Sequence, residues 1–185
     1  MKPGVRALGV AESYRGDRST LAGMVVRASR VVDGVCFTSC TVGGLDATET
    51  IVSLYEGLDR DDVHYVFVAG IAIAWYNVLD LHAIHEGTGR PVLSVSFEES
   101  PGLAAAFEEA FSGAALEERL SIYEAQPERE RLSVNDETVF VRSVGLSDEP
   151  ASTVVRGFTP EGGRPEPVRV ARLAARGADR YRREG

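Results

Sequence analysis

Two predicted strand ends decide whether this chain can hold a metal ion. Segments 5–12 and 64–70 read as buried strands that run into polar loops, and they end in Ala11-Glu12 and Ala69-Gly70. Ligands and catalytic groups gather where such strands end in open α/β sheets. Neither alanine can bind a cation or move a proton. Glu12 is long enough to reach back toward the missing acid, although a lone carboxylate makes a poor magnesium site; the alternative is a solvated residue at the start of a loop.

Polar residues before two predicted helices have two interpretations each. Asp46, with Glu49 three positions later, forms a capping box ahead of an apolar helical pattern, and the same loop lies near the expected mouth of a pocket. Asn77 and Asp80 stand at the start of a helix predicted over about 77–86, where they can be both caps and pocket walls. A cap stabilises a helix by about 1 kcal/mol without any chemistry. Capping is the favoured interpretation of Asp46 and Glu49.

The cysteines and histidines do not form a recognisable site. Cys36 and Cys40 are four residues apart in a predicted strand, where their side chains point to one face about 13 Å apart and cannot form a disulfide. His82 and His85 lie three apart on a helix, but without a nearby cysteine or third histidine a packed or half-exposed pair is favoured over a zinc site. We therefore predict no confident metal site.

An arginine stripe is the clearest charge feature. Arg169, Arg172, Arg176 and Arg180 share one face of the last predicted helix, and residues 164–183 carry seven arginines against two acids in a chain whose net charge is −8. Such asymmetry can mark a phosphate-binding face; an amphipathic helix that pairs with the acidic body is the favoured alternative. The single lysine and 19 arginines resemble the composition of proteins from salt-loving archaea. Across most of this acidic surface, non-specific affinity for nucleic acid should be weak.

The order of predicted elements indicates one α/β domain over residues 1–185. Strands at 20–32 and 35–42, joined by a hairpin turn at Asp33-Gly34, follow the first strand. A helix, a strand at 64–69, a helix and a strand at 92–97 come next, which implies parallel crossovers. A helical pair, a polar linker at 126–131, a strand at 138–144 and two C-terminal helices complete the pattern, and the tail from about 181 should fray. The start lacks a signal peptide and no apolar run spans a bilayer, so we expect a cytoplasmic protein without a membrane partner.

This connectivity is that of the ribonuclease H-like fold, and four segments in order carry a family resemblance. They are RALGVAE at 6–12, GGLDATE at 43–49, Ala69-Gly70 with YNVLD at 76–80, and RPEPVRVA at 164–171. Together they resemble the archaeal endonuclease dU family, which is similar to endonuclease V. The resemblance covers about residues 4–177. It implies a ribonuclease H-like fold, cleavage of DNA beside a deaminated base such as deoxyuridine, and Mg²⁺ or Mn²⁺ held by carboxylates.

The chain departs from the family pattern at the positions that matter for catalysis. The first-strand motif Gly-Ile-Asp-Asp is Gly9-Val10-Ala11-Glu12 here, the fourth-strand Asp-Gly is Ala69-Gly70, and a segment that tends toward basic residues reads Glu98-Glu99. Phosphoryl transfer at such sites relies on acids that hold a metal and cations that meet phosphate. The resemblance therefore implies a DNA-repair endonuclease whose catalysis is altered or lost. The alternative is a non-catalytic nucleic-acid-binding, scaffold or dimerisation protein, in which Trp75 and Tyr76 serve a base or a second subunit.

Overall fold

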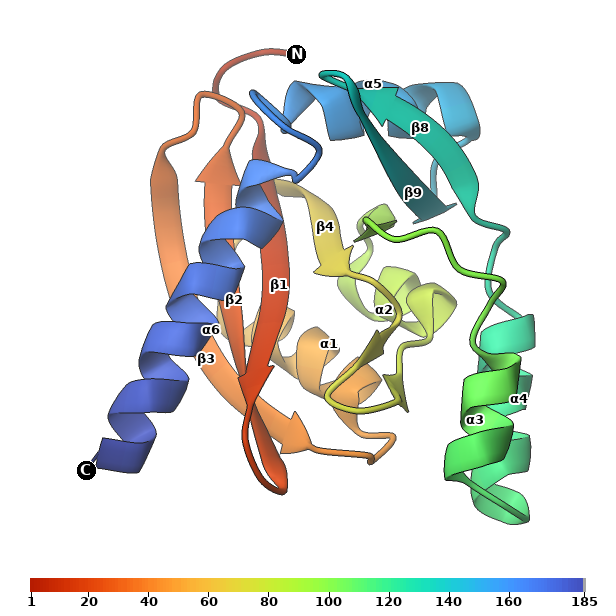
Figure 1. Cartoon of the computed structure of the whole chain (residues 1–185). Helices are drawn as coiled ribbons and strands as arrows, with labels where there is room; N and C mark the ends of the chain where they lie inside the picture. The colour runs from red at the N-terminus through yellow and green to blue at the C-terminus, as the bar shows by residue number, and fades with distance from the viewer. Residues whose placement is uncertain (185) are drawn as a thin grey trace.

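A seven-stranded mixed sheet with helices on both faces forms the computed structural model, which describes residues 1–184 (Figure 1). Its strands, in spatial order β3-β2-β1-β4-β7-β9-β8, are β1 (Arg6–Tyr14), β2 (Arg18–Arg27), β3 (Val32–Thr41), β4 (Val63–Ala69), β7 (Val92–Ser96), β8 (Glu130–Val134) and β9 (Glu137–Val144). A separate small hairpin pairs β5 (Ala72–Ile73) with β6 (Asn77–Val78). The helices are α1 (Ala47–Gly57), α2 (Leu81–Thr88), α3 (Ala104–Ala110), α4 (Ala114–Glu124), α5 (Asp148–Gly157) and α6 (Glu166–Glu184).

The strand directions confirm the predicted fold class. β1, β2 and β3 form an antiparallel meander, and β4 and β7 then add to β1 in parallel through helical crossovers. β9 and β8 extend the sheet antiparallel to β7. This is the order of the ribonuclease H-like fold, with the helical elaboration at its C-terminal end.

The two faces of the sheet bury different side chains, because strand residues alternate between faces. Leu8 and Val10 of β1 pack with Ile51 and Leu54 of α1 in the core beneath α1 and α2. On the other face α6 crosses β1 and β2, as Figure 1 shows. That contact is close: a Cβ added to Gly9 would lie 2.2 Å from backbone atoms of Pro167. Only glycine therefore fits where the last helix crosses the first strand.

The predicted turn at Asp33-Gly34 is wrong. Both residues lie inside β3, and Asp33 occupies a bulge where the pairing of β2 with β3 shifts register. The chain turns instead over residues 28–31, where Arg30 takes the left-handed conformation with φ of 71°. Tertiary contacts override the local turn preference: Arg27 Nε donates to the Asp33 carboxylate at 3.0 Å, Arg60 Nη2 donates to it at 3.2 Å, and Arg6 is a third donor.

This cluster predicts a loss of stability in acid. The hydrogen bonds from Arg27 and Arg6 hold the pKa of Asp33 well below its usual range. A carboxyl group whose pKa is lower in the folded than in the unfolded chain stabilises the fold above the unfolded pKa of about 3.9 and loses that contribution as the pH falls through the folded value. We expect Asp33→Asn to lower the urea midpoint at pH 7, with a difference from the wild type that shrinks below about pH 4. Exposed Asp17→Asn is the matched control, and a pH-independent Asp33→Asn difference would contradict the prediction.

Three other boundaries differ from the predicted ones. The helix predicted from Asn77 starts at Leu81, because residues 77–78 pair with residues 72–73 in the small hairpin. The predicted polar linker at 126–131 already contains the start of β8, whose alternating pattern is too short to stand out. The tail predicted to fray from 181 continues α6 to Glu184, and the call on Gly185 lies outside the described residues.

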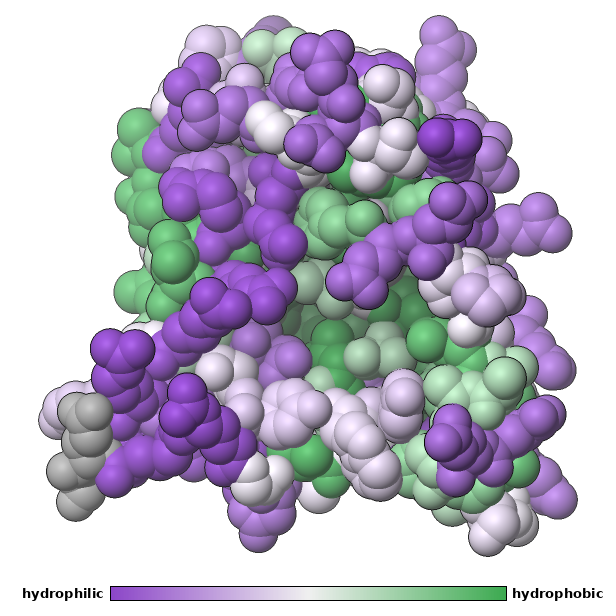
Figure 2. Space-filling view, in the orientation of Figure 1, coloured by the Kyte–Doolittle hydropathy of each residue, from purple (hydrophilic) through white to green (hydrophobic). Residues whose placement is uncertain are grey.

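β3 is an edge strand with an apolar outer surface. Its exposed hydrophobic residues, together with the one preceding it, are Val31, Val32, Val35 and Phe37. They form the green margin over β3 in Figure 2. No helix within residues 1–184 is both long enough and apolar enough to cross a membrane.

Candidate functional site

The two alanines predicted to meet at neighbouring strand ends do so. β1 and β4 pair in parallel with Val10 opposite Val68, so that Ala11 and Ala69 are the next residues of each strand. Ala11 is 3% exposed and packs with Met24 of β2 and Ala171 of α6. Ala69 is half-buried and borders a cavity. The place where the family motif carries two acids is therefore apolar on one side and open on the other.

Glu12 lies on the opposite face of the sheet from Ala11. It accepts a hydrogen bond from Ser19 Oγ at 2.9 Å and another from the backbone of Ala74. Burial raises the pKa of Glu12 against the effect of these hydrogen bonds. Because adjacent strand residues point to opposite faces, its carboxylate does not replace an acid at position 11.

Asp46 and Glu49 do not form the predicted capping box. The Asp46 carboxylate turns back to accept hydrogen bonds from the Thr41 backbone at 3.0 Å and from Asn77 Nδ2 at 2.8 Å, whereas Glu49 is exposed. Burial acts to raise the pKa of Asp46, but these hydrogen bonds lower it overall. Asn77 caps α1 in place of Asp46, because its Oδ1 accepts from the backbone N–H of Ala47 at 3.1 Å. Sequence reasoning missed this because the cap comes from 30 residues away.

Asp80 is a helix cap as predicted. Its carboxylate accepts from the backbone N–H groups of His82 and Ala83, at 2.9 and 3.2 Å, in the first turn of α2. These bonds satisfy donors that the helix itself cannot.

A left-handed turn follows the end of β4. Ala74, Trp75 and Tyr76 have φ angles of 45°, 55° and 63°, a conformation that side chains with a Cβ disfavour. Arg119 of α4 holds this turn, since its guanidinium donates to the carbonyls of Tyr76 and of Gly43 and Gly44 and stacks on Phe111 with 3.8 Å from Cζ to the ring centroid. Trp75 remains 48% exposed beside this cluster and does not border the cavity next to Ala69.

That cavity, which we call the strand-end pocket, has a volume of about 410 Å³ and opens at the ends of β4 and β7. It is lined by Ala69, Gly70, Ile71, Ala72, Ser94, Val95, Ser96, Phe97, Glu98, Ser100, Gly102, Leu103, Tyr123, Arg129, Arg142, Arg164 and Arg172. Figure 2 shows a hollow on this face with hydrophobic residues on its floor and hydrophilic ones along its rim. The pocket thus combines an apolar base with four arginines.

The arginines on the two sides of the strand-end pocket differ in how they are bound. Arg129 donates to the carbonyls of Glu98 and Ser100 at 3.3 and 3.2 Å, and Arg142 stacks on Tyr123 at 5.4 Å. Arg164 stacks on Phe97 at 4.0 Å, and its Nη1 is buried without a hydrogen-bond partner among the described residues. An unpaired buried donor costs about 1–3 kcal/mol. Burial first, and then Arg172 and Arg176, lower the pKa of Arg164.

The predicted arginine stripe divides along α6. Arg169 pairs with Glu166 at 2.6 Å, as the pairing interpretation expects. Arg172 reaches the strand-end pocket, and Arg176 and Arg180 line a second hollow with Ser13 and Asp179. Neither Arg172 nor Arg176 lies within 4 Å of a carboxylate among the side chains that the structure describes. The sequence missed Arg129 and Arg142 as pocket residues, because nothing local links them to α6.

The cysteines and histidines remain outside any site. Burial raises the pKa of Cys36 and Cys40 to about 11. His85 contacts the carbonyl of Arg90 at 2.7 Å, and His64 and His82 are exposed. Over residues 1–184, no three His, Cys, Asp or Glu side chains are grouped so that they could hold a metal ion.

Comparison with known proteins gives concordant matches. A family model described as endonuclease dU matches residues 3–178. A UPF0215 protein of Methanopyrus kandleri is 33% identical over 96% of this chain and 92% of its own. A crystal structure of a protein of unknown function from Archaeoglobus fulgidus has a TM-score of 0.84 at 25% identity, covering 94% of this chain and 97% of that one. Endonuclease V of Ciona intestinalis, solved with DNA containing inosine, shares the fold with a TM-score of 0.64 at 14% identity, covering 95% and 86%.

Proposed function

Because the chain belongs to the endonuclease dU family, we propose that it binds DNA containing a deaminated base such as deoxyuridine but does not cleave it. The nuclease fold supports a nucleic-acid ligand, since endonuclease V of the same fold has been solved with DNA. The observation that carries the loss of cleavage is the pair Ala11 and Ala69 at adjoining strand ends. Phosphodiester hydrolysis in this family is expected to need acids at those two positions.

The carboxylates near the strand ends do not fit a divalent metal. Mg²⁺ binds through one or two carboxylates in a nearly octahedral set of oxygens. Glu12 points to the other face and is hydrogen-bonded, Asp46 is held by Thr41 and Asn77, and Glu98 faces a pocket that contains four arginines. Arginine side chains would repel a cation there. We therefore derive no catalytic step through a metal in this protein.

The chain's own residues support binding in another way. The arginines of α6 and of the strand-end pocket supply positive charge on a chain that is acidic as a whole, which favours phosphate groups on this face. Trp75 offers a half-exposed ring close to the same loop, and bases of any sequence stack on such rings. Arg119 holds that ring's backbone in place before a ligand arrives.

The test is a paired binding and nicking assay on one deoxyuridine-containing duplex. We expect binding that weakens as salt rises and no strand cleavage with Mg²⁺ or Mn²⁺. Titration calorimetry with Mn²⁺ should show no stoichiometric site. A duplex with thymidine in place of deoxyuridine controls for base preference.

Two outcomes would count against the proposal. Metal-dependent nicking that disappears in Glu12→Gln would show that the acids have moved within the site and that the protein is an active nuclease. No affinity for either duplex would favour the alternative, a structural module that self-associates, for which the apolar edge of β3 is the candidate surface. Thermal unfolding of each preparation checks that the protein assayed is folded.

A further inference from the structure

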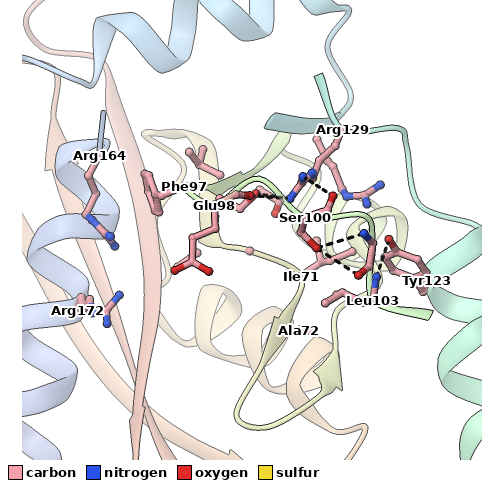
Figure 3. A pocket seen from close by; sticks show the side chains of 17 residues that line it. Ile71, Ala72, Phe97, Glu98, Ser100, Leu103, Tyr123, Arg129, Arg164 and Arg172 are labelled. Carbon is pink, nitrogen blue, oxygen red and sulfur yellow. Dashed lines mark hydrogen bonds between the residues drawn. The ribbon is translucent and has the colours of Figure 1, made fainter. Parts of the chain in front are cut away.

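Two guanidinium groups on one wall of the strand-end pocket have hydrogen-bond donors to spare. Arg164 and Arg172 enter from the start of α6, and Figure 3 shows both side chains directed toward the cavity from the same side. Neither forms an ion pair among the side chains that the structure describes, and Arg164 Nη1 is buried with no partner. Buried polar groups in folded proteins are almost always paired. An unpaired guanidinium at a cavity wall therefore indicates an anion that is absent from the protein alone.

The fold holds this wall in position. Stacking on Phe97 fixes the plane of the Arg164 guanidinium, and the close approach of Pro167 to Gly9 fixes the first turn of α6. Arg172 follows two turns later on the same helix and faces the same cavity. Like charges brought together in this way repel one another, and an anion between them relieves that repulsion.

The opposite wall contributes charge but few free donors. Arg129 is already bound to the carbonyls of Glu98 and Ser100, and it stacks on Phe140 at 4.3 Å. Ala69 and Gly70 complete the floor with no side chain that could repel an anion. A pocket lined by acids at this place would attract a cation, whereas this one attracts the group that a cation would otherwise bring in.

Glu98 is the one carboxylate in the pocket. Figure 3 shows its side chain between the Arg164 wall and the Ala72 side, yet it forms no ion pair with Arg164 or Arg172 within 4 Å. It is exposed and sits on an irregular segment after β7, so it can turn outward. Glu98 therefore opposes an anion without neutralising the arginines.

We propose that the strand-end pocket binds a phosphate group directly through Arg164 and Arg172, without a divalent cation. This inference rests on the proposed function for the source of that phosphate, the backbone of a nucleic acid. A free phosphate or nucleotide presents the same chemistry. The volume of about 410 Å³ accommodates either one.

The experiment measures binding in EDTA with three probes: inorganic phosphate, thymidine monophosphate and a single-stranded deoxyuridine oligonucleotide. The variants are Arg164→Gln with Arg172→Gln, the charge-preserving Arg164→Lys, and Glu98→Gln. Arg156→Gln is the matched control, because Arg156 lies on α5 outside the pocket and removes the same charge. Thermal unfolding of each variant shows whether it is folded.

In EDTA we expect the double variant to bind the oligonucleotide at least tenfold more weakly, with a salt dependence reduced by about two phosphate contacts. Arg164→Lys should fall between, since lysine keeps the charge but lacks the planar fork, and Glu98→Gln should bind two- to fivefold more tightly. Arg156→Gln should match the wild type. A loss for the oligonucleotide and for both small ligands supports the proposal.

The failure of each idea is distinguishable. Phosphate binding that depends on Arg164 and Arg172 without any affinity for the oligonucleotide would support the anion site and overturn the nucleic-acid function. Oligonucleotide binding that is unchanged in the double variant would overturn the site and leave the nucleic-acid function standing. Binding of any probe that vanishes in EDTA and returns with Mn²⁺ would overturn direct recognition.

Discussion

Replacing Arg119 with methionine should lower the free energy of unfolding by about 3–5 kcal/mol. Methionine keeps much of the side-chain volume, but it leaves the carbonyls of Gly43, Gly44 and Tyr76 without the donor that now satisfies them. Arg119 is only 3% exposed, so water does not easily take its place. Leaving buried polar groups unpaired is among the few mechanisms that give losses of this size.

Tryptophan fluorescence gives a second measurement of the same change. Trp75 is the only tryptophan and lies in the left-handed turn that Arg119 holds, so its emission reports on that turn alone. We expect a red shift in the folded variant and a lower urea midpoint. Arg131→Met, an exposed arginine on β8, should change stability by less than about 0.5 kcal/mol. Equal effects from the two variants would show that Arg119 is not a structural anchor.

Ala11→Asp should destabilise the protein by about 3 kcal/mol, although it restores the residue that the family motif carries. Ala11 is buried against Met24 and Ala171, so the new carboxylate would be desolvated beneath α6. Ala69→Asp is the matched control, because Ala69 is half-buried at a pocket that contains arginines. It should cost less than about 1 kcal/mol. Urea unfolding of the two variants checks both values.

Manganese adds a further readout in the double variant. With both carboxylates present at adjoining strand ends, Mn²⁺ bound only by the folded chain should raise the unfolding midpoint. The wild type should show no such rise. A wild-type midpoint that rises with Mn²⁺, or an Ala11→Asp variant as stable as the wild type, would mean that the site under α6 has kept room for a metal.

The arrangement of the sheet could be predicted because it depends on long apolar runs. The segments around Val10, Val25, Val68 and Val95 are hydrophobic enough to be buried in any compact fold, and the residues between them settle which crossovers are parallel. Local turn and cap signals were less reliable. Asp33-Gly34 has the sequence of a tight turn, but Arg6 and Arg60 from other elements bind Asp33 inside the strand.

The site could be predicted only in part. Ala11 and Ala69 were found because each terminates a recognisable strand, and parallel pairing brings such ends together. The pocket arginines are spread over positions 129, 142, 164 and 172, with no spacing that links them. Their convergence depends on where α6 crosses the sheet, which is determined by the absence of a side chain at Gly9. A single sequence carries no sign of that contact.

The crossing of the first strand by the last helix also governs when the protein can become complete during synthesis. Domains emerge from the ribosome N-terminal end first, so β1 and β2 can pair long before α6 exists to cover Ala11 and Ala22. Contacts between the two ends of a chain carry a large loop-closure entropy and form slowly. Until α6 docks, the sheet exposes an apolar face and lacks both Arg164 and Arg172. A nascent or truncated chain is thus unable to engage phosphate, and affinity for the anion arises only with the finished molecule.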